Sequence, residues 1–155
     1  MKRDPKAKEY PNYRQPTHQK NPESFDQKQI RFRFDLLDFD HSLWGWNNLN
    51  KEQFIDVLKF LQSFEKQTWA EVKQTAGGRS KGTNHHSLEI SEFHKRARDR
   101  LSELKLDRII GDTLFSIRIN NCTRIYGLRE DEFCRIIWHD PHHGNPASGA
   151  YPTKQ

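Results

Sequence analysis

The block from residue 113 to residue 139 constrains the fold of this chain more than any other part of its sequence. It contains three short segments in which apolar and polar residues alternate, at 114–119, 123–129 and 133–139, joined by short polar connections. Alternation with a period of two is typical of strands that bury one face, and such short connections join antiparallel neighbours. The sequence therefore predicts a three-stranded antiparallel meander.

A further strand and two helices are predicted upstream of the meander. Residues 30–36 alternate apolar and polar side chains, which predicts a strand. Asn50 and Gln53 have the spacing of a capping box, so we expect a helix from there to about residue 73, and Ser91 can cap a second helix. The expected fold is α+β, with an antiparallel sheet of about four strands (β-α-α-β-β-β) and both helices packed on one face.

Composition divides the chain into one domain and two tails. Residues 1–29 contain four prolines, seven Lys or Arg and only four Asp or Glu, so we expect a disordered basic tail there. Residues 30–143 are expected to form a single domain, and residues 144–155 a flexible C-terminal tail.

The same composition bears on the compartment and on the partner. No apolar stretch is long enough to cross a membrane, and the basic N-terminus has no apolar region behind it, so we expect a cytoplasmic protein without a secretory signal. In that reducing compartment, Cys122 and Cys134 are expected to be buried thiols rather than a disulfide. The net charge of +5 favours an anionic partner.

The expected register of the meander predicts one basic sheet face. With a three-residue first turn and a two-residue second turn, Gly127 faces Cys134 and the aliphatic side chains, with Trp138, form the core face. Because unpaired buried arginines are costly, the opposite face should be open to solvent or bind an anion, and an ordinary solvated surface is the alternative. That face carries Arg118, Arg124, Tyr126, Arg135 and His139.

The last predicted strand leads into a polar cluster made up of His139, Asp140, His142 and His143. Histidine titrates near neutral pH and can move protons at a phosphodiester, while arginine stabilises the charge of the transition state. The combination is suited to RNA cleavage without a metal. A divalent metal site at the same residues, or a polar strand end without chemistry, are the alternatives.

The meander resembles the RelE/ParE toxin superfamily. The resemblance is carried by Leu114–Ile119, Thr123–Arg129 and Phe133–His139; it covers residues 88–143, and the first strand and helix match only by their order. It implies metal-independent cleavage of free or ribosome-bound mRNA and an acidic antitoxin protein that covers the basic face. Other members with this scaffold poison gyrase and do not cut RNA, so the fold alone does not fix the function.

The expected function is therefore a toxin-type, metal-independent endoribonuclease without a cofactor. The candidate catalytic residues are His139, His142, Tyr126 and Arg124. The candidate RNA-binding residues are Arg118, Arg135, Lys81, His85 and His86.

Two other functions remain open. The chain could be a non-catalytic nucleic-acid binder. We expect Trp44 and Trp46 to fill the core, and an exposed stacking platform, which would serve such a binder, is the alternative. It could also be a protein-interaction module whose arginines bind an acidic partner. Whether the chain is an enzyme at all is not decided by these patterns.

Overall fold

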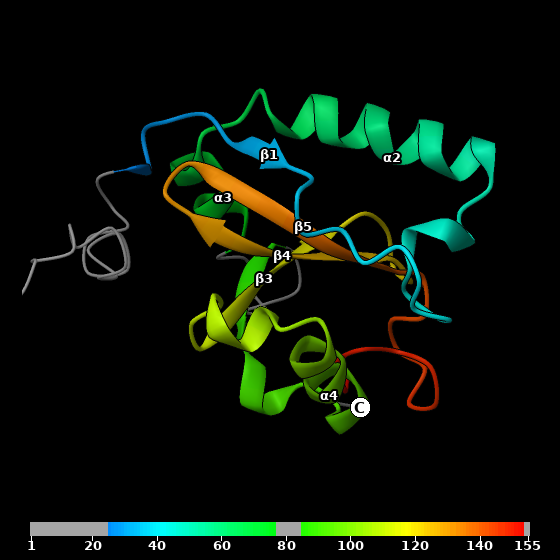
Figure 1. Cartoon of the computed structure of the whole chain (residues 1–155). Helices are drawn as coiled ribbons and strands as arrows, with labels where there is room; N and C mark the ends of the chain where they lie inside the picture. Colours follow the sequence, from blue (N-terminus) through cyan, green and yellow to red (C-terminus); the bar gives the residue numbers. More distant parts are fainter. Residues whose placement is uncertain (1–24, 77–84, 154–155) are drawn as a thin grey trace, which may run out of the picture.

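The computed structural model of the chain describes residues 25–76 and 85–153 and contains one five-stranded sheet (Figure 1). The strands lie in the order β1-β5-β4-β3-β2. Their bounds are Arg31–Arg33 for β1, His86–Glu89 for β2, Thr113–Arg118 for β3, Arg124–Glu130 for β4 and Phe133–Asp140 for β5. β1 runs parallel to β5, and the other neighbours are antiparallel. The α+β class is as predicted, but the sheet is mixed rather than four-stranded and antiparallel.

The first predicted helix is two helices. α2 (Lys51–Phe64) begins at the predicted capping box, in which Asn50 and Gln53 exchange two hydrogen bonds of 2.8 Å. It ends at Phe64, and α3 (Trp69–Ala76) follows. Thr68 and Glu71 form a second box, with Glu71 N–H donating to Thr68 Oγ1 at 3.2 Å and Thr68 N–H to Glu71 Oε2 at 3.3 Å. This second box starts a new helix and explains why the first does not continue to residue 73.

The helix expected from Ser91 begins later. Ser91 lies in the 3₁₀ turn η3 (Ile90–Glu92), and α4 (Lys95–Glu103) has His94 at its N-cap. Two further 3₁₀ turns are η2 (Trp46–Asn48) and η4 (Leu106–Arg108). β2 was not predicted, because four residues that alternate only between exposed and half-buried carry little pattern.

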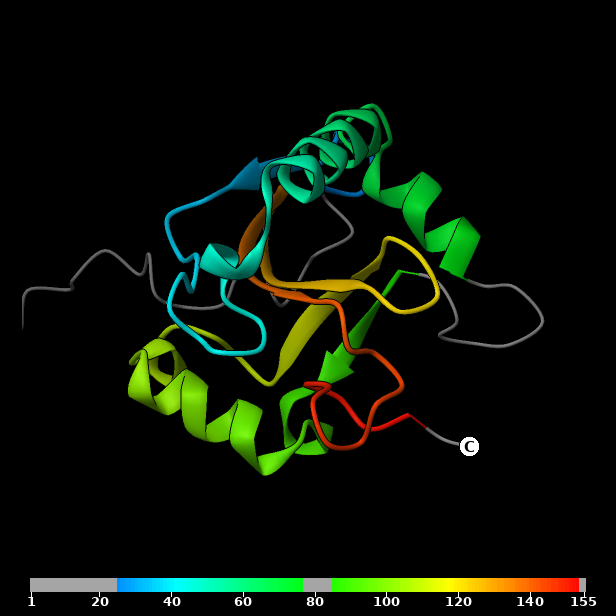
Figure 2. The ribbon, with the colours of Figure 1, turned by 90° about the vertical axis from the view of Figure 1, so that its right-hand side faces the viewer.

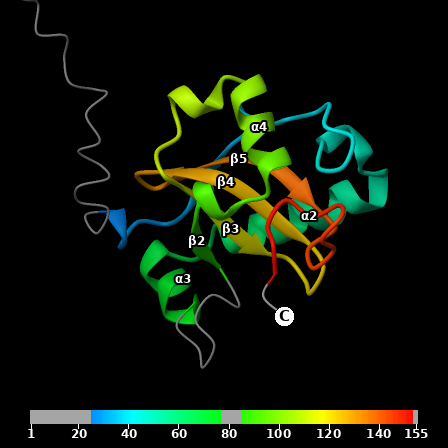
Figure 3. The ribbon, with the colours of Figure 1, turned by 90° about the horizontal axis from the view of Figure 1, so that it is seen from below.

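Helices cover both faces of the sheet, which contradicts the prediction that they share one face. Figures 1 and 2 show α2 on one side of the strands and α4 on the other. In Figure 3, which views the molecule from below, α4 lies in front of the strands. The α2-side core includes Val57, Leu61, Trp69, Phe115, Ile117, Ile125 and Ile136. The α4-side core includes Phe93, Leu101, Leu114, Tyr126, Ile137 and Trp138. The second sheet face is therefore buried, not open.

A register shift in the β4–β5 ladder redistributes the side chains of β5. Gly127 pairs with Ile136 and Tyr126 with Trp138, which leaves Ile137 as an extra residue. Ile137 and Trp138 consequently lie in the same α4-side core, and every later residue of β5 changes face. Trp138 was predicted on the other face, and the bulge is the physical reason that this prediction is wrong.

The two hairpins of the meander differ in how well they match the sequence. In the first, the predicted pairs Phe115–Gly127 and Ile117–Ile125 are confirmed. In the second, Gly127 faces Ile136 rather than Cys134, because the turn centres on Asp131, whose φ of 58° is left-handed. The bounds of all three strands nevertheless lie within one residue of the predicted segments.

The folded unit extends beyond 30–143 at both ends. Asp26 accepts hydrogen bonds from Lys73 Nζ at 2.6 Å and from Arg129 Nη2 at 2.8 Å. Ala150 is fully buried, so the segment expected to be a flexible tail from residue 144 packs on the domain as far as this residue. Residues 1–24 and 154–155, the remainder of the two predicted tails, lie outside the described residues.

Both cysteines are free thiols. Cys134 is buried, as predicted, and burial raises its pKa to about 12, whereas Cys122 is exposed at the β3–β4 turn, which contradicts the prediction. Among the described segments, no helix has the length and apolar character needed to cross a membrane.

Candidate functional site

Three residues of the predicted basic face do not belong to an accessible site, and Tyr126 is the first of them. Its side chain is 0% exposed, and its ring packs edge-on against Phe93 with 5.2 Å between centroids. Burial raises the pKa of its hydroxyl, which has no hydrogen-bond partner among the described residues. Tyr126 is therefore a core residue and cannot stack on a nucleotide.

Arg135 lies at the opposite end of the sheet from the other two arginines. Its Nη2 is 2.7 Å from Asp35 Oδ2, and its Nη1 is 3.2 Å from Glu130 Oε2. The hydrogen bond to Asp35 raises the pKa of Arg135 further. Two carboxylates thus neutralise this guanidinium, and it does not join a phosphate site with Arg118 or Arg124.

His139 is only 6% exposed and lies on the opposite face from the one predicted. The bulge places it opposite Ile125, in the α2-side part of the molecule, where its ring centroid is 5.6 Å from that of Trp46. Burial lowers the pKa of His139 to about 4. An imidazole enclosed in this way does not reach a substrate from the predicted face.

The structure does gather basic side chains at one end of the sheet. Arg118, at the end of β3, pairs with Arg124, at the start of β4. Arg124 in turn pairs with Asp140, the last residue of β5, so the turn that follows β5 lies beside the β3–β4 hairpin (Figure 2). β2 begins beside the same end of β3. We call the resulting group the cationic corner; its members are His85, His86, Arg118, Arg124 and His143.

Local hydrogen bonds position both arginines of the cationic corner. The Arg118 backbone N–H donates to His85 Nδ1 at 3.0 Å, and the Arg118 guanidinium donates to Asn121 Oδ1. Arg124 Nη1 donates to the carbonyl of Asn120 at 2.6 Å. The β3–β4 turn therefore fixes the two guanidinium groups relative to each other, and His85 acts on Arg118 as a positioning residue.

The cationic corner is a region of mutual repulsion. Burial, followed by the charges of Arg124 and Arg118, lowers the pKa of His143 to about 4. Burial and the charge of Arg124 lower the pKa of His85 to about 4 as well. Burial also lowers the pKa of Arg124 itself. The charge of Asp140 already offsets part of this repulsion at Arg124, and an anion placed here would relieve the remainder.

A hollow of about 530 Å³ adjoins the cationic corner. It lies between the β3–β4 turn and the turn after β5, which are joined by a 2.9 Å hydrogen bond from His143 N–H to the carbonyl of Cys122. His143 belongs to both features, and its Nδ1 is buried without a hydrogen-bond partner among the described residues. The lining residues are Cys122, Pro141, His142, His143, Gly144, Asn145 and Pro146.

The predicted site residues therefore separate into three groups. The structure brings together Arg118, Arg124, His85 and His86, and places His142 in the adjoining hollow. It encloses Tyr126 in the core beside Arg124, turns His139 to the other face of the sheet, and leaves Arg135 at the other end. Lys81 lies outside the described residues. His143 and Cys122 were not among the predicted site residues, although the pair His142–His143 in the sequence was a usable indication of the first.

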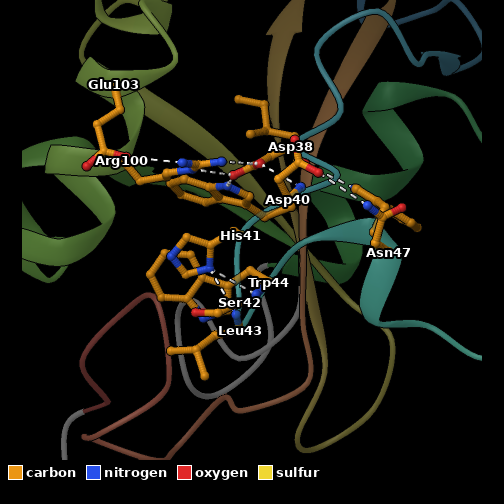
Figure 4. Close-up of polar contacts among 12 residues, drawn as sticks. Asp38, Asp40, His41, Ser42, Leu43, Trp44, Asn47, Arg100 and Glu103 are labelled. Atoms are coloured by element: carbon orange, nitrogen blue, oxygen red, sulfur yellow. Dashed lines mark hydrogen bonds and ion pairs between the residues drawn. The ribbon is translucent and has the colours of Figure 1, made fainter.

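A polar network around Asp38 and His41 lies outside the set of predicted site residues (Figure 4). Asp38 accepts hydrogen bonds from Arg100 and, at 2.9 Å, from Trp138 Nε1. His41 Nδ1 accepts the backbone N–H groups of Leu43 and Trp44 at 3.2 Å and 3.1 Å. Burial alone would raise the pKa of Asp38, but the hydrogen bonds from Arg100 and Trp138 hold it below its ordinary value.

The network ties the loop after β1 to α4 and β5, and the two tryptophans of this loop take part in the core. Trp44 Nε1 donates to the carbonyl of Ser148 at 2.8 Å, and Trp46 Nε1 donates to that of Ile137 at 3.0 Å. Both side chains are buried. Trp44 and Trp46 are therefore core residues, not an exposed stacking platform.

Within residues 25–76 and 85–153, no three or more His, Cys, Asp or Glu side chains are arranged to hold a metal ion. Comparisons with protein-family models, curated proteins and solved structures found no match. The resemblance to the RelE/ParE superfamily therefore stays a prediction from the sequence.

Proposed function

We propose that the cationic corner binds the phosphodiester backbone of RNA and cleaves it, so that this protein is an endoribonuclease working through side-chain acid–base chemistry. The observation that carries the proposal is the gathering of the corner itself. Three separate segments, around β2, the β3–β4 turn and the end of β5, bring imidazoles together with Arg118 and Arg124, whose like charges repel each other. Function offsets such a cost when an anionic ligand occupies the site.

The side chains suit a transesterification. His143, with its pKa lowered to about 4, is uncharged at neutral pH and can accept the proton of a ribose 2′-hydroxyl. The 2′-oxygen then attacks phosphorus, the bond from phosphorus to the 5′-oxygen breaks, and a second imidazole donates a proton to the leaving oxygen. His142 and His86 are the candidate donors. The products are a 2′,3′-cyclic phosphate and a 5′-hydroxyl.

The arginines supply the charge stabilisation in this mechanism. Arg118 and Arg124 are held at neighbouring positions by the β3–β4 turn. Arg118 is half-buried and can contact the oxygens of a phosphate with its planar guanidinium, whereas Arg124 is only 8% exposed, donates to the carbonyls of Asn120 and Thr123, and contributes its charge from behind. The negative charge on those oxygens grows in the transition state, so the arginines stabilise it more than the ground state. Bound phosphate also favours a protonated His143, which makes this imidazole a better base.

The proposal requires RNA rather than DNA as the substrate, because the 2′-hydroxyl is the nucleophile. A single-stranded DNA of the same sequence should bind to the cationic corner and remain intact. The toxin-type setting, dependence on the ribosome and an acidic antitoxin remain predictions that rest on the resemblance alone.

The test uses the purified full chain, a labelled single-stranded RNA and EDTA in the buffer. We expect cleavage that leaves cyclic-phosphate ends and that falls by roughly 10²- to 10⁴-fold in His143→Gln. The matched control is His139→Gln, which changes a neighbouring but enclosed histidine and should keep most of the activity once folding is confirmed by circular dichroism.

Other outcomes of this test distinguish between the alternative functions. Salt-dependent RNA binding with no cleavage of either free or ribosome-bound RNA would refute the enzyme and favour the non-catalytic nucleic-acid binder. Absence of RNA binding would refute both, and co-purification with a small acidic protein would then favour an interaction module.

A further inference from the structure

The hollow beside the cationic corner has walls held in place from several directions. Asp140 Oδ1 accepts His142 N–H at 2.7 Å, and its Oδ2 accepts Ala150 N–H at 2.8 Å. Arg96 Nη2 donates to the carbonyls of Pro146 and Gly149. The turn after β5 is therefore fixed to β5 and to α4, and the hollow does not need to be formed by the ligand.

The size and chemistry of this hollow suit a flat, partly polar group. The hollow, of about 530 Å³, is shallow and largely open to solvent, so a flat group could lie on its lining without being enclosed. Proline rings, imidazoles and a thiol make up much of its lining, and proline and imidazole rings present flat surfaces on which a nucleobase can stack.

We infer that the hollow is a nucleobase subsite, which receives the base of a nucleotide whose phosphate lies on the cationic corner. His143 lines the hollow and belongs to the corner, so a base and the phosphate attached to it can occupy the two features together. The inference rests on the proposed function, because it assigns a base to the hollow only beside a bound RNA phosphate.

A nucleobase subsite determines whether single-stranded or duplex RNA can be the substrate. A base inside a duplex is stacked and paired, so it cannot enter a hollow without leaving the helix, at a cost in stacking and pairing energy. Single-stranded RNA or an unpaired loop presents such a base without this cost. The protein should therefore act on single-stranded RNA, and duplex RNA should bind only through its phosphates.

The exposed thiol of Cys122 reports on occupancy of the hollow. N-ethylmaleimide should alkylate Cys122 in the native protein and leave the buried Cys134 unmodified, which mass spectrometry can verify. The probe is 2′-O-methyl hexaadenylate, which cannot be cleaved, and the control is the same sugar–phosphate chain without bases. Both are used at concentrations that give equal occupancy by fluorescence anisotropy.

We expect hexaadenylate to slow the alkylation of Cys122 by roughly tenfold and the abasic chain to leave the rate nearly unchanged. Equal protection by both chains would overturn the inference and leave a phosphate site alone. Bound hexaadenylate that does not protect Cys122 would overturn it too. Failure of hexaadenylate to bind at all would instead refute the proposed function, and the inference with it.

A second variant gives an independent check. Cys122→Trp should fill the hollow from an exposed position and weaken the binding of hexaadenylate by roughly tenfold, with little effect on the abasic chain. An equal loss of affinity for both chains would show that the substitution acts on the cationic corner, which contradicts a separate base subsite.

Discussion

Asp38 and Arg100 form a two-pronged ion pair across 62 positions of the sequence, with 2.7 Å between Oδ1 and Nη2 and 2.9 Å between Oδ2 and Nε. The Asp38 side chain is 1% exposed, and its Oδ2 also accepts the indole N–H of Trp138. One carboxylate therefore joins the loop after β1 to α4 and to β5.

Replacing this carboxylate should be strongly destabilising. We expect Asp38→Asn to lower the free energy of unfolding by about 3–5 kcal/mol, because it removes the buried charged partner of Arg100 and leaves only the exposed Glu103. Asp99→Asn, which breaks the exposed pair of Asp99 with Lys95, should cost about 0–1 kcal/mol. Guanidinium chloride unfolding of both variants measures the difference, and similar losses would show that the buried pair contributes no more than a surface pair.

The enclosed histidines predict a loss of stability in mild acid. Burial lowers the pKa of His85 and His139 to about 4 in the folded protein, from an ordinary value near 6.5. The unfolded chain therefore binds protons that the folded chain does not between these two values, so stability falls as the pH falls from about 6.5 to 4.

The contribution of one histidine to this acid sensitivity can be isolated. His139→Gln should lower the dependence of the unfolding free energy on pH by up to about 1.4 kcal/mol per pH unit within that window. Above pH 7.5 the variant and the original protein should have equal slopes. Identical slopes at pH 4.5–6 would mean that His139 is not held in its neutral form by burial.

The arginines predicted to act together should differ in their effect on RNA binding. Arg118→Gln should weaken binding and reduce the slope of log K against log salt by about 0.7, the value for one phosphate contact on a single strand. Arg135→Gln, whose guanidinium is paired with Asp35 and Glu130, should leave that slope unchanged. Anisotropy titrations at four salt concentrations measure the slope for each variant. A lowered slope in Arg135→Gln would show that RNA binds at the Arg135 end of the sheet and contradict the proposed site.

Gly127 should not tolerate a side chain. A Cβ at this position would lie 2.7 Å from the carbonyl oxygen of Arg135 and 3.0 Å from Cys134 Sγ. Because the first contact is with backbone, Gly127→Ala should cost about 1–3 kcal/mol through displacement of β5. Gly144→Ala provides the comparison, since its φ is 93° but nothing lies within 4 Å, so only backbone strain of about 1–2 kcal/mol is expected. Thermal unfolding and near-ultraviolet circular dichroism should show loss of tertiary packing only in Gly127→Ala.

The sequence predicted the elements whose information is local. The alternation in the meander located β3, β4 and β5 to within one residue, and the Asn50–Gln53 box located the start of α2. The Thr68–Glu71 box is an equally local pattern and was available in the sequence, but the continuing apolar periodicity favoured one long helix. Two local patterns thus predicted different structures here, and the protein follows the Thr68–Glu71 box rather than the apolar periodicity.

The failures in the candidate site depend on long-range packing. No periodicity reveals that α4 covers the second sheet face and encloses Tyr126, or that Arg135 meets Asp35 from 100 positions away. Arg118 and Arg124 could be paired because a short turn joins them, whereas His139 was misplaced by a bulge that adds one residue to β5. The corner could thus be predicted in part: the sequence grouped His143 with a polar cluster but did not show that it lies beside Arg118 and Arg124.

The extra residue in β5 offers a way to identify relatives where alignment fails. Insertion or deletion of one position between the Asp131 turn and the His139–Asp140 pair would exchange the sides on which Trp138 and His139 lie, and both cores would be lost. A homologous chain must therefore preserve this spacing even if most of its side chains have diverged. The number of residues between the Asp131 turn and His139 is therefore a criterion for recognising such chains in genomes.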